Sequence, residues 1–282
     1  MFYGQNATIF FFLTLIVVIQ TQKSYASHII GGEITYTCVG GNNFDLHLDL
    51  YRDCNSGTGF DNPLYITVFN DAGMVLKTEN MGGPSITTLD WTEGVEGICL
   101  INGVTVCVQQ GAYNKSNVAL TGSAGKYTIS YQRCCRNSGV VNIVNPGSTG
   151  STYTIEIPTF SPGACDNSSP VFNNYPPMVL CAGSPYIFDH SATDIDGDSL
   201  VYDFCTPFIG ASLGMPAPMT ASAPPYTPVT WATGYSQSYQ LASTPPMTID
   251  GATGSLVAYP NAIGRFLVGI CVTEDRIGIP LS

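Results

Sequence analysis

The most constraining feature of this chain is a period-two alternation of apolar and polar residues in short runs. Residues 44–50 (FDLHLDL) alternate without a break, which is typical of an antiparallel strand with one buried face. The chain also has 30 Gly and 19 Pro, which disfavour long helices. Similar short runs occupy residues 65–70, 104–109, 126–132, 152–157, 200–205 and 265–273. The sequence therefore predicts an all-β protein.

Turn-forming clusters separate these runs, and the chain length favours more than one domain. A 44% hydrophobic share with 16 Tyr and 13 Phe is enough for a packed core and excludes a disordered chain. The turn-rich stretch 158–177 is the best boundary, so we expect two tandem antiparallel β-sandwich domains at 27–165 and 166–282. The Pro-rich stretch 207–228 is expected to be a long surface loop. The second domain is expected to be truncated at its C-terminus.

The first 26 residues have the features of a cleaved signal peptide. The apolar run 9–19 is too short to span a membrane, and Ser24-Tyr25-Ala26 matches the small-x-small pattern before a cleavage site. No later segment is apolar enough to span. We therefore expect an extracellular or cell-surface protein, with no membrane span once the signal is removed.

Charge is scarce and mostly negative. The chain has 9 Lys+Arg against 20 Asp+Glu, only 10% charged residues in all, with a net charge of −11. Nucleic-acid binding needs clustered cations along the phosphate backbone, so that class of function is excluded.

Ten cysteines in an exported chain predict disulfide bonds, because thiols oxidise outside the cytosol. No CxxC pair or Cys/His set of the kind that binds zinc occurs. Two pairings are favoured: Cys99 with Cys107 across the Asn102-Gly103 turn, and Cys205 with Cys271 between two strong strands. The disulfide candidates are Cys38, Cys54, Cys99, Cys107, Cys134, Cys135, Cys165, Cys181, Cys205 and Cys271.

Two of these cysteines are adjacent in the sequence. The side chains of Cys134 and Cys135 would point to opposite sides of an extended chain, so each is expected to take a different partner. Cys38 and Cys54 are the candidate partners. The sequence leaves the full connectivity open.

The sharpest chemical signal is the acidic loop 194–199 (DIDGDS). Carboxylates at alternate positions, with Gly allowing a tight turn, can converge on one hard cation such as calcium. Residues 137–264 contain eight acids and no Lys or Arg, so a bound divalent ion would relieve their repulsion. The alternative is a solvated Asp/Gly-rich turn. Neighbouring acids that could contribute are Asp189, Asp203, Glu274 and Asp275.

Several motifs resemble known bacterial surface modules. Residues 190–202 (HSATDIDGDSLVY) resemble the Ala-Thr-Asp-x-Asp-Gly-Asp-x-Leu-x-Tyr signature of cadherin-like and immunoglobulin-like (Ig-like) modules. Residues 247–256 and 260–266 are similar to later strands of those modules. A second likeness spans nearly the whole mature chain: it resembles the N-terminal region of large secreted Bacteroidota proteins of the gliding-motility-associated or type IX secretion type. The segments that support it are 27–36, 51–54, 131–137 and 169–177.

These resemblances imply a non-catalytic, structural or adhesive module of a longer cell-surface protein, with further domains of the same chain downstream. In cadherin-like modules the Asp-x-Asp loop ligates calcium near a domain junction. Carried over, the resemblance assigns Asp194, Asp196 and Asp198 as calcium ligands and Asp275 as a contributor. The implied partners are a surface polysaccharide or another surface protein.

Two other functions are less well supported by the sequence. Ile29-Ile30-Gly31-Gly32 resembles the start of an activated trypsin-like protease, but Ser199 lacks the following turn that forms an oxyanion hole. We therefore expect no protease, and no motif indicates another enzyme. A carbohydrate-binding module is the alternative, since Trp91, Trp231 and the tyrosines could stack on sugar rings. Buried tryptophans would favour the calcium-stiffened module instead.

Overall fold

A computed structural model describes most of the chain after residue 28. The described residues are 29–89, 106–122, 125–158, 165–175, 178–276 and 279–280. The predicted signal peptide, Cys99 and Trp91 lie outside them. Across the described residues the protein is all-β, with a single short 3-10 helix at Pro146–Ser148. None of their helices is long and apolar enough to cross a membrane.

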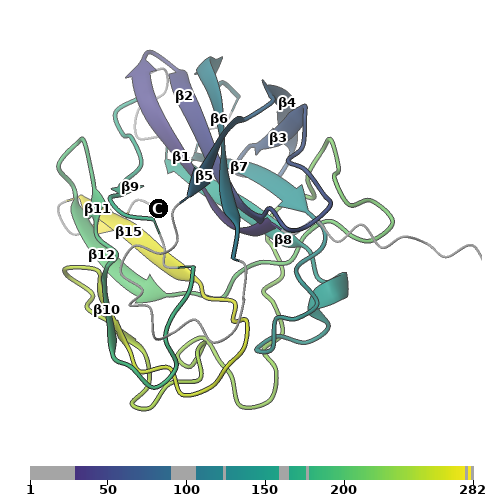
Figure 1. Ribbon diagram of the computed structural model, residues 1–282. Helices are drawn as coiled ribbons and strands as arrows, with labels where there is room; N and C mark the ends of the chain where they lie inside the picture. The colour runs from purple at the N-terminus through teal and green to yellow at the C-terminus, as the bar shows by residue number, and fades with distance from the viewer. Residues whose placement is uncertain are drawn as a thin grey trace, which may run out of the picture.

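The N-terminal part consists of two four-stranded antiparallel sheets (Figure 1). We call it the two-sheet unit. One sheet has the order β1-β2-β6-β5 and the other β4-β3-β7-β8. The strands are β1 (Ile29–Gly40), β2 (Asn43–Asp53), β3 (Leu64–Phe69), β4 (Val75–Gly82), β5 (Ser85–Leu89), β6 (Val108–Ala119), β7 (Lys126–Arg133) and β8 (Ser151–Pro158).

One hydrophobic core joins the two sheets. The predicted alternation places Leu46, Leu48 and Leu50 of β2 inward, and Leu48 and Leu50 are fully buried. Ile66, Ile129 and other apolar residues from β3 and β7 pack against them from the opposite sheet. Burial of aliphatic side chains contributes roughly 1.5–3 kcal/mol each, so this core dominates the stability of the unit.

The second half is built from smaller sheets with the orders β10-β14-β13, β11-β9 and β12-β15-β16. A second, smaller core gathers Leu241, Met247, Leu256 and Ala258. The strands are β9 (Val171–Phe172), β10 (Tyr186–Asp189), β11 (Ala192–Thr193), β12 (Ser199–Phe204), β13 (Thr248–Ile249), β14 (Ser255–Ala258), β15 (Ile270–Arg276) and β16 (Ile279–Pro280).

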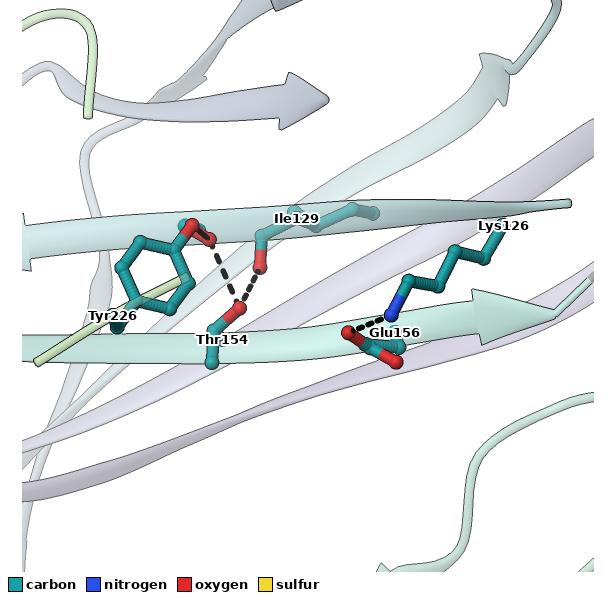
Figure 2. A network of polar contacts seen from close by, with 6 residues as sticks. Lys126, Ile129, Thr154, Glu156 and Tyr226 are labelled. Carbon is teal, nitrogen blue, oxygen red and sulfur yellow. Dashed lines mark hydrogen bonds and ion pairs between the residues drawn. The ribbon is translucent and has the colours of Figure 1, made fainter. Parts of the chain in front are cut away.

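The stretch 207–228 lies outside the named strands and is largely exposed, as expected of a surface loop, but it also covers part of the two-sheet unit, and we call it the cover segment. It lies across the outer face of β3, β7 and β8, where Thr67 and Ser130 are fully buried. The backbone N–H of Ala221 donates to Thr67 Oγ1 at 2.8 Å. Tyr226 hydrogen-bonds to Ser130, which is linked through Thr154 to the Ile129 carbonyl (Figure 2). Polar side chains on this sheet face therefore bind a distant segment instead of water.

A reciprocal contact runs from the two-sheet unit into the second half. Asn142, in the loop between β7 and β8, is fully buried. Its Nδ2 donates to the carbonyls of Gln240 at 2.6 Å and Leu267 at 2.7 Å, and its Oδ1 accepts from Leu267 N–H at 2.9 Å. The two parts thus exchange segments across their boundary.

Four disulfides join described cysteines. Cys205 and Cys271 are bridged, as predicted: Cys205 directly follows β12, and Cys271 lies on the paired strand β15. The prediction for Cys107 was wrong, since it pairs with Cys54 rather than Cys99. The reason is register: β2 and β6 place Asp53 opposite Val108, so Cys54 and Cys107 meet one step beyond.

The prediction for Cys134 and Cys135 was also wrong, because they are bonded to each other. Strand β7 ends at Arg133, so the alternating side-chain directions assumed in the prediction do not extend to these residues. Cys38, offered as a partner for them, is bonded instead to Cys165, which lies just before the predicted domain boundary. Cys181 is disulfide-bonded as well.

Candidate metal site

The acidic loop forms a tight turn between β11 and β12 (Figure 1). The Asp194 Oδ1 atom accepts a hydrogen bond from the backbone N–H of Asp198 at 2.8 Å, which closes the loop. Gly197 has a φ of 81°, a left-handed conformation that favours glycine. This local geometry brings the Asp194 and Asp198 side chains to the same side.

The third carboxylate comes from β15, about 80 residues further along the chain. The register pairs Leu200 with Glu274, so Glu274 lies beside the start of β12, directly after the loop. One carboxylate oxygen each from Asp194, Asp198 and Glu274 lies within 4.8 Å of the others. We call this group the acidic triad.

Burial distinguishes the triad from an ordinary acidic surface. Glu274 is 0% exposed, and the two aspartates are partly buried. The Asp194 Oδ2 atom is buried and has no hydrogen-bond partner among the described residues. Burying a carboxylate oxygen without a partner is costly, because the oxygen loses its water contacts. A cation between the three carboxylates would remove that cost.

The triad is connected to the two-sheet unit through residues 167–169. The buried Asn167 side chain donates from Nδ2 to Glu274 Oε2 at 3.1 Å and to the Tyr36 hydroxyl oxygen on β1 at 2.9 Å. The Ser169 hydroxyl oxygen accepts from the Tyr36 backbone N–H at 2.9 Å. The site therefore lies where the second half contacts the core of the two-sheet unit.

The surroundings of Tyr36 show the electrostatic effect of these acids. Burial raises the pKa of the Tyr36 hydroxyl above its ordinary value, and the nearby charges of Glu274, Asp196 and Asp194 raise it further. An additional negative charge is thus disfavoured at this junction, whereas a positive charge is favoured.

The structure brings together only part of the predicted ligand set. Asp194 and Asp198 meet as expected, but the third member is Glu274 rather than Asp196 or Asp275. Asp196 turns toward the linker, where its Oδ2 accepts from the Ser168 N–H at 2.6 Å. Asp275 neighbours Glu274 on β15, and adjacent strand residues point to opposite faces. Strand parity shows that only one of Glu274 and Asp275 can face the loop, but the register of β15 against β12 is needed to identify Glu274 as that residue.

The donor set indicates which ions the triad could hold. Three carboxylates without sulfur or imidazole suit a hard divalent cation such as calcium, magnesium or manganese. Calcium takes six to eight oxygens, so the triad would supply part of the shell and other oxygens, including water, the rest. The group can therefore hold a metal ion.

The aromatic side chains do not form a stacking row on the described part of the chain. Only Tyr175 and Tyr259 are exposed among the described aromatic residues, and they belong to different segments. Trp231 is partly buried, and its Nε1 donates to Thr206 Oγ1 at 3.3 Å. The carbohydrate-binding alternative therefore gains no support from these residues.

Comparison of the chain with protein-family models, curated proteins and solved structures finds no match.

Proposed function

We propose that this chain is a non-catalytic, calcium-binding module of a bacterial cell-surface protein, with a structural or adhesive role. The single observation that supports the calcium site is the acidic triad, in which a fully buried Glu274 lies beside two loop aspartates. The multiple disulfides fit an oxidising, extracellular environment. The Ig-like or cadherin-like identity of the second half, its export and its bacterial source remain part of this proposal.

The role of the ion follows from the position of the triad. Its carboxylates belong to the loop before β12 and to β15, and Asn167 links Glu274 to Tyr36 in the core of the two-sheet unit. A bound calcium ion would hold these three segments at fixed distances and oppose the repulsion between the carboxylates. The expected result is a stiffer junction between the two parts, as a surface stalk under load requires.

The proposal predicts that calcium raises the melting temperature of the mature protein. A ligand that binds only the folded state stabilises it by RT ln(1 + [L]/Kd), which is about 2.7 kcal/mol at a hundredfold excess over Kd. For a chain of this size that is roughly a 5–10 °C shift. The measurement is a thermal melt of residues 27–282 with calcium, then with excess chelator.

Variants separate site binding from general ionic effects. Glu274→Gln and Asp198→Asn should lose most of the calcium-dependent shift. Asp203→Asn is the matched control, since Asp203 is an exposed acid on β12 outside the triad, and it should keep the full shift. A melting temperature that calcium leaves unchanged would refute the metal site.

A further inference from the structure

A buried histidine lies where the linker between the two parts joins the second half. Strand β9 pairs with β11 (Figure 1). Directly after β9, the Asn173 backbone N–H donates to the Ser191 carbonyl at 2.9 Å, and the Thr193 hydroxyl donates to Asn173 Oδ1 at 2.7 Å. Residues 171–174 are therefore held to the second half by residues 189–193. We call this contact the latch.

His190 lies at the centre of the latch and is only 8% exposed. Its ring stacks on Phe172 of β9, with 4.4 Å between the ring centroids, and lies 5.6 Å from Phe188 of β10. Its backbone N–H donates to the carbonyl of Gly254, directly before β14, at 3.2 Å. His190 is thus fixed to the second half, and Phe172 packs on it from the linker side.

The buried ring can take a second proton only at a cost. His190 Nδ1 is buried and has no hydrogen-bond partner among the described residues. In a neutral ring this nitrogen can be the acceptor, whereas in an imidazolium it is a donor, and a buried donor without an acceptor is costly. The two phenylalanine faces attract a cation, but this attraction is smaller than the loss of hydration and of a hydrogen bond. Protonation therefore favours an opened latch, in which water reaches the ring.

The acids around the latch are each hydrogen-bonded within their own turn. Their carboxylates accept from backbone N–H groups two to four residues further along the chain; these acids are Asp189, Asp194 and Asp250. The other titratable side chains on the surrounding strands are Tyr186 of β10 and Tyr202 of β12, and residues 171–174 have none. Burial lowers the pKa of His190 below its ordinary value of 6.5, and the charge of Asp189 opposes this shift only in part. The neutral ring is therefore the stable form in the closed latch.

We propose that the latch is an acid-sensitive switch, in which protonation of His190 releases residues 171–174 from the second half. Above pH 6.5 the neutral ring keeps Phe172 packed against it. As the pH falls below 6.5, the open form binds the proton more tightly than the closed form, so the open share of the molecules rises.

The linker itself would remain on the two-sheet unit. Cys165 is disulfide-bonded to Cys38 of β1, and the Ser169 backbone N–H donates to the Tyr36 carbonyl of β1 at 2.9 Å. Acid would therefore loosen the contact between the two parts at the latch without freeing the linker.

The test is amide hydrogen exchange of residues 27–282, measured by NMR in excess chelator so that a bound cation does not contribute. The Asn173 N–H reports on the latch directly, because it donates to Ser191. In the parent its protection factor should fall about fivefold or more between pH 7 and pH 5, since each unit by which folding lowers a pKa changes the opening equilibrium tenfold. In His190→Phe, which keeps a stacked ring without a titratable nitrogen, the protection factor should stay constant. His190→Gln, which is smaller and also neutral, should behave in the same way.

The matched control is His47→Gln, which removes a histidine from β2 of the two-sheet unit and should keep the pH dependence of the parent. Three results would overturn the proposal. They are a constant protection factor in the parent, an equal fall in the parent and both His190 variants, or a His190 ring that titrates in the folded protein at pH 6.5 or above. Because calcium is absent throughout, the outcome is independent of the calcium melt.

Discussion

Single buried acids determine how the stability of the two-sheet unit depends on pH. The pKa of Glu33 is about 7 in the folded protein, above its ordinary value of 4.5, so the folded state holds the proton more tightly than the unfolded state. The resulting stabilisation is complete below pH 4.5 and is lost as pH rises to about 7. The pKa of His47 is raised from 6.5 to about 8, so the stabilisation that it contributes is also lost as the pH rises between those two values.

Glu33→Gln should therefore stabilise the protein at pH 8, where the native carboxylate is charged and poorly solvated. We expect a gain of roughly 1–3 kcal/mol at pH 8 that disappears near pH 4.5, because protonated Glu33 resembles Gln. Urea unfolding of parent and variant at several pH values measures the difference. A difference for Glu33→Gln that does not depend on pH would contradict this interpretation.

Individual strands were predictable where local pattern alone determines them. The alternation at 44–50 identified β2 and its buried leucines, and the runs at 126–132 and 152–157 match β7 and β8 closely. Long-range contacts were not predictable in the same way. Thr67 and Ser130 have the pattern of solvent-facing residues, but the stretch 207–228 buries them, and no local signal shows which distant segment covers a polar face.

The same limit applies to the candidate site. The loop aspartates follow from the motif, because Asp194 and Asp198 are neighbours within one turn. Predicting Glu274 requires the exact register of β12 against β15. The predicted Cys205–Cys271 bridge implies that register only approximately. A one-residue difference on a strand exchanges Glu274 for Asp275, so an approximate register is not sufficient to choose between them.

The cover segment gives a prediction at the scale of elements. Gln132 of β7 is almost fully buried, donates from Nε2 to Ser222 Oγ at 2.7 Å, and accepts from Ser222 N–H at 3.0 Å. Gln132→Leu leaves the Ser222 backbone N–H without this acceptor, and we expect a loss of about 1–3 kcal/mol in the free energy of unfolding.

Chemical denaturation measures this loss, with Gln237→Leu as the control. The Gln237 amide also makes two hydrogen bonds, to Thr206 and to the Phe204 carbonyl, but it is exposed. Its replacement should cost clearly less, about 0.5 kcal/mol, because water can satisfy the groups left behind. Equal costs for the two variants would show that the segment 207–228 does not stabilise the sheet face that it covers.

At the scale of the molecule, two separate hydrophobic cores are connected by exchanged segments. The larger core draws on residues 29–157, and the smaller one on residues 241–258. The stretch 207–228 covers the two-sheet unit, Asn142 reaches into the second half, and the Cys38–Cys165 bridge holds the linker to β1. The division into domains at 165 and 166 stays a prediction, but these contacts make independent unfolding of the parts unfavourable.

We therefore expect residues 27–282 to unfold in one cooperative transition when all disulfides are intact. If one part unfolded alone, the buried polar face of β7 and β8, or the Asn142 side chain, would lose its hydrogen-bond partners. Each such loss costs about 1–3 kcal/mol. Differential scanning calorimetry should show a single peak whose calorimetric and van't Hoff enthalpies agree. Calcium should move the whole peak, because the triad lies at the contact between the parts. The opposite result would be two resolved peaks, of which calcium moves only one. It would mean that the exchanged segments do not couple the two cores.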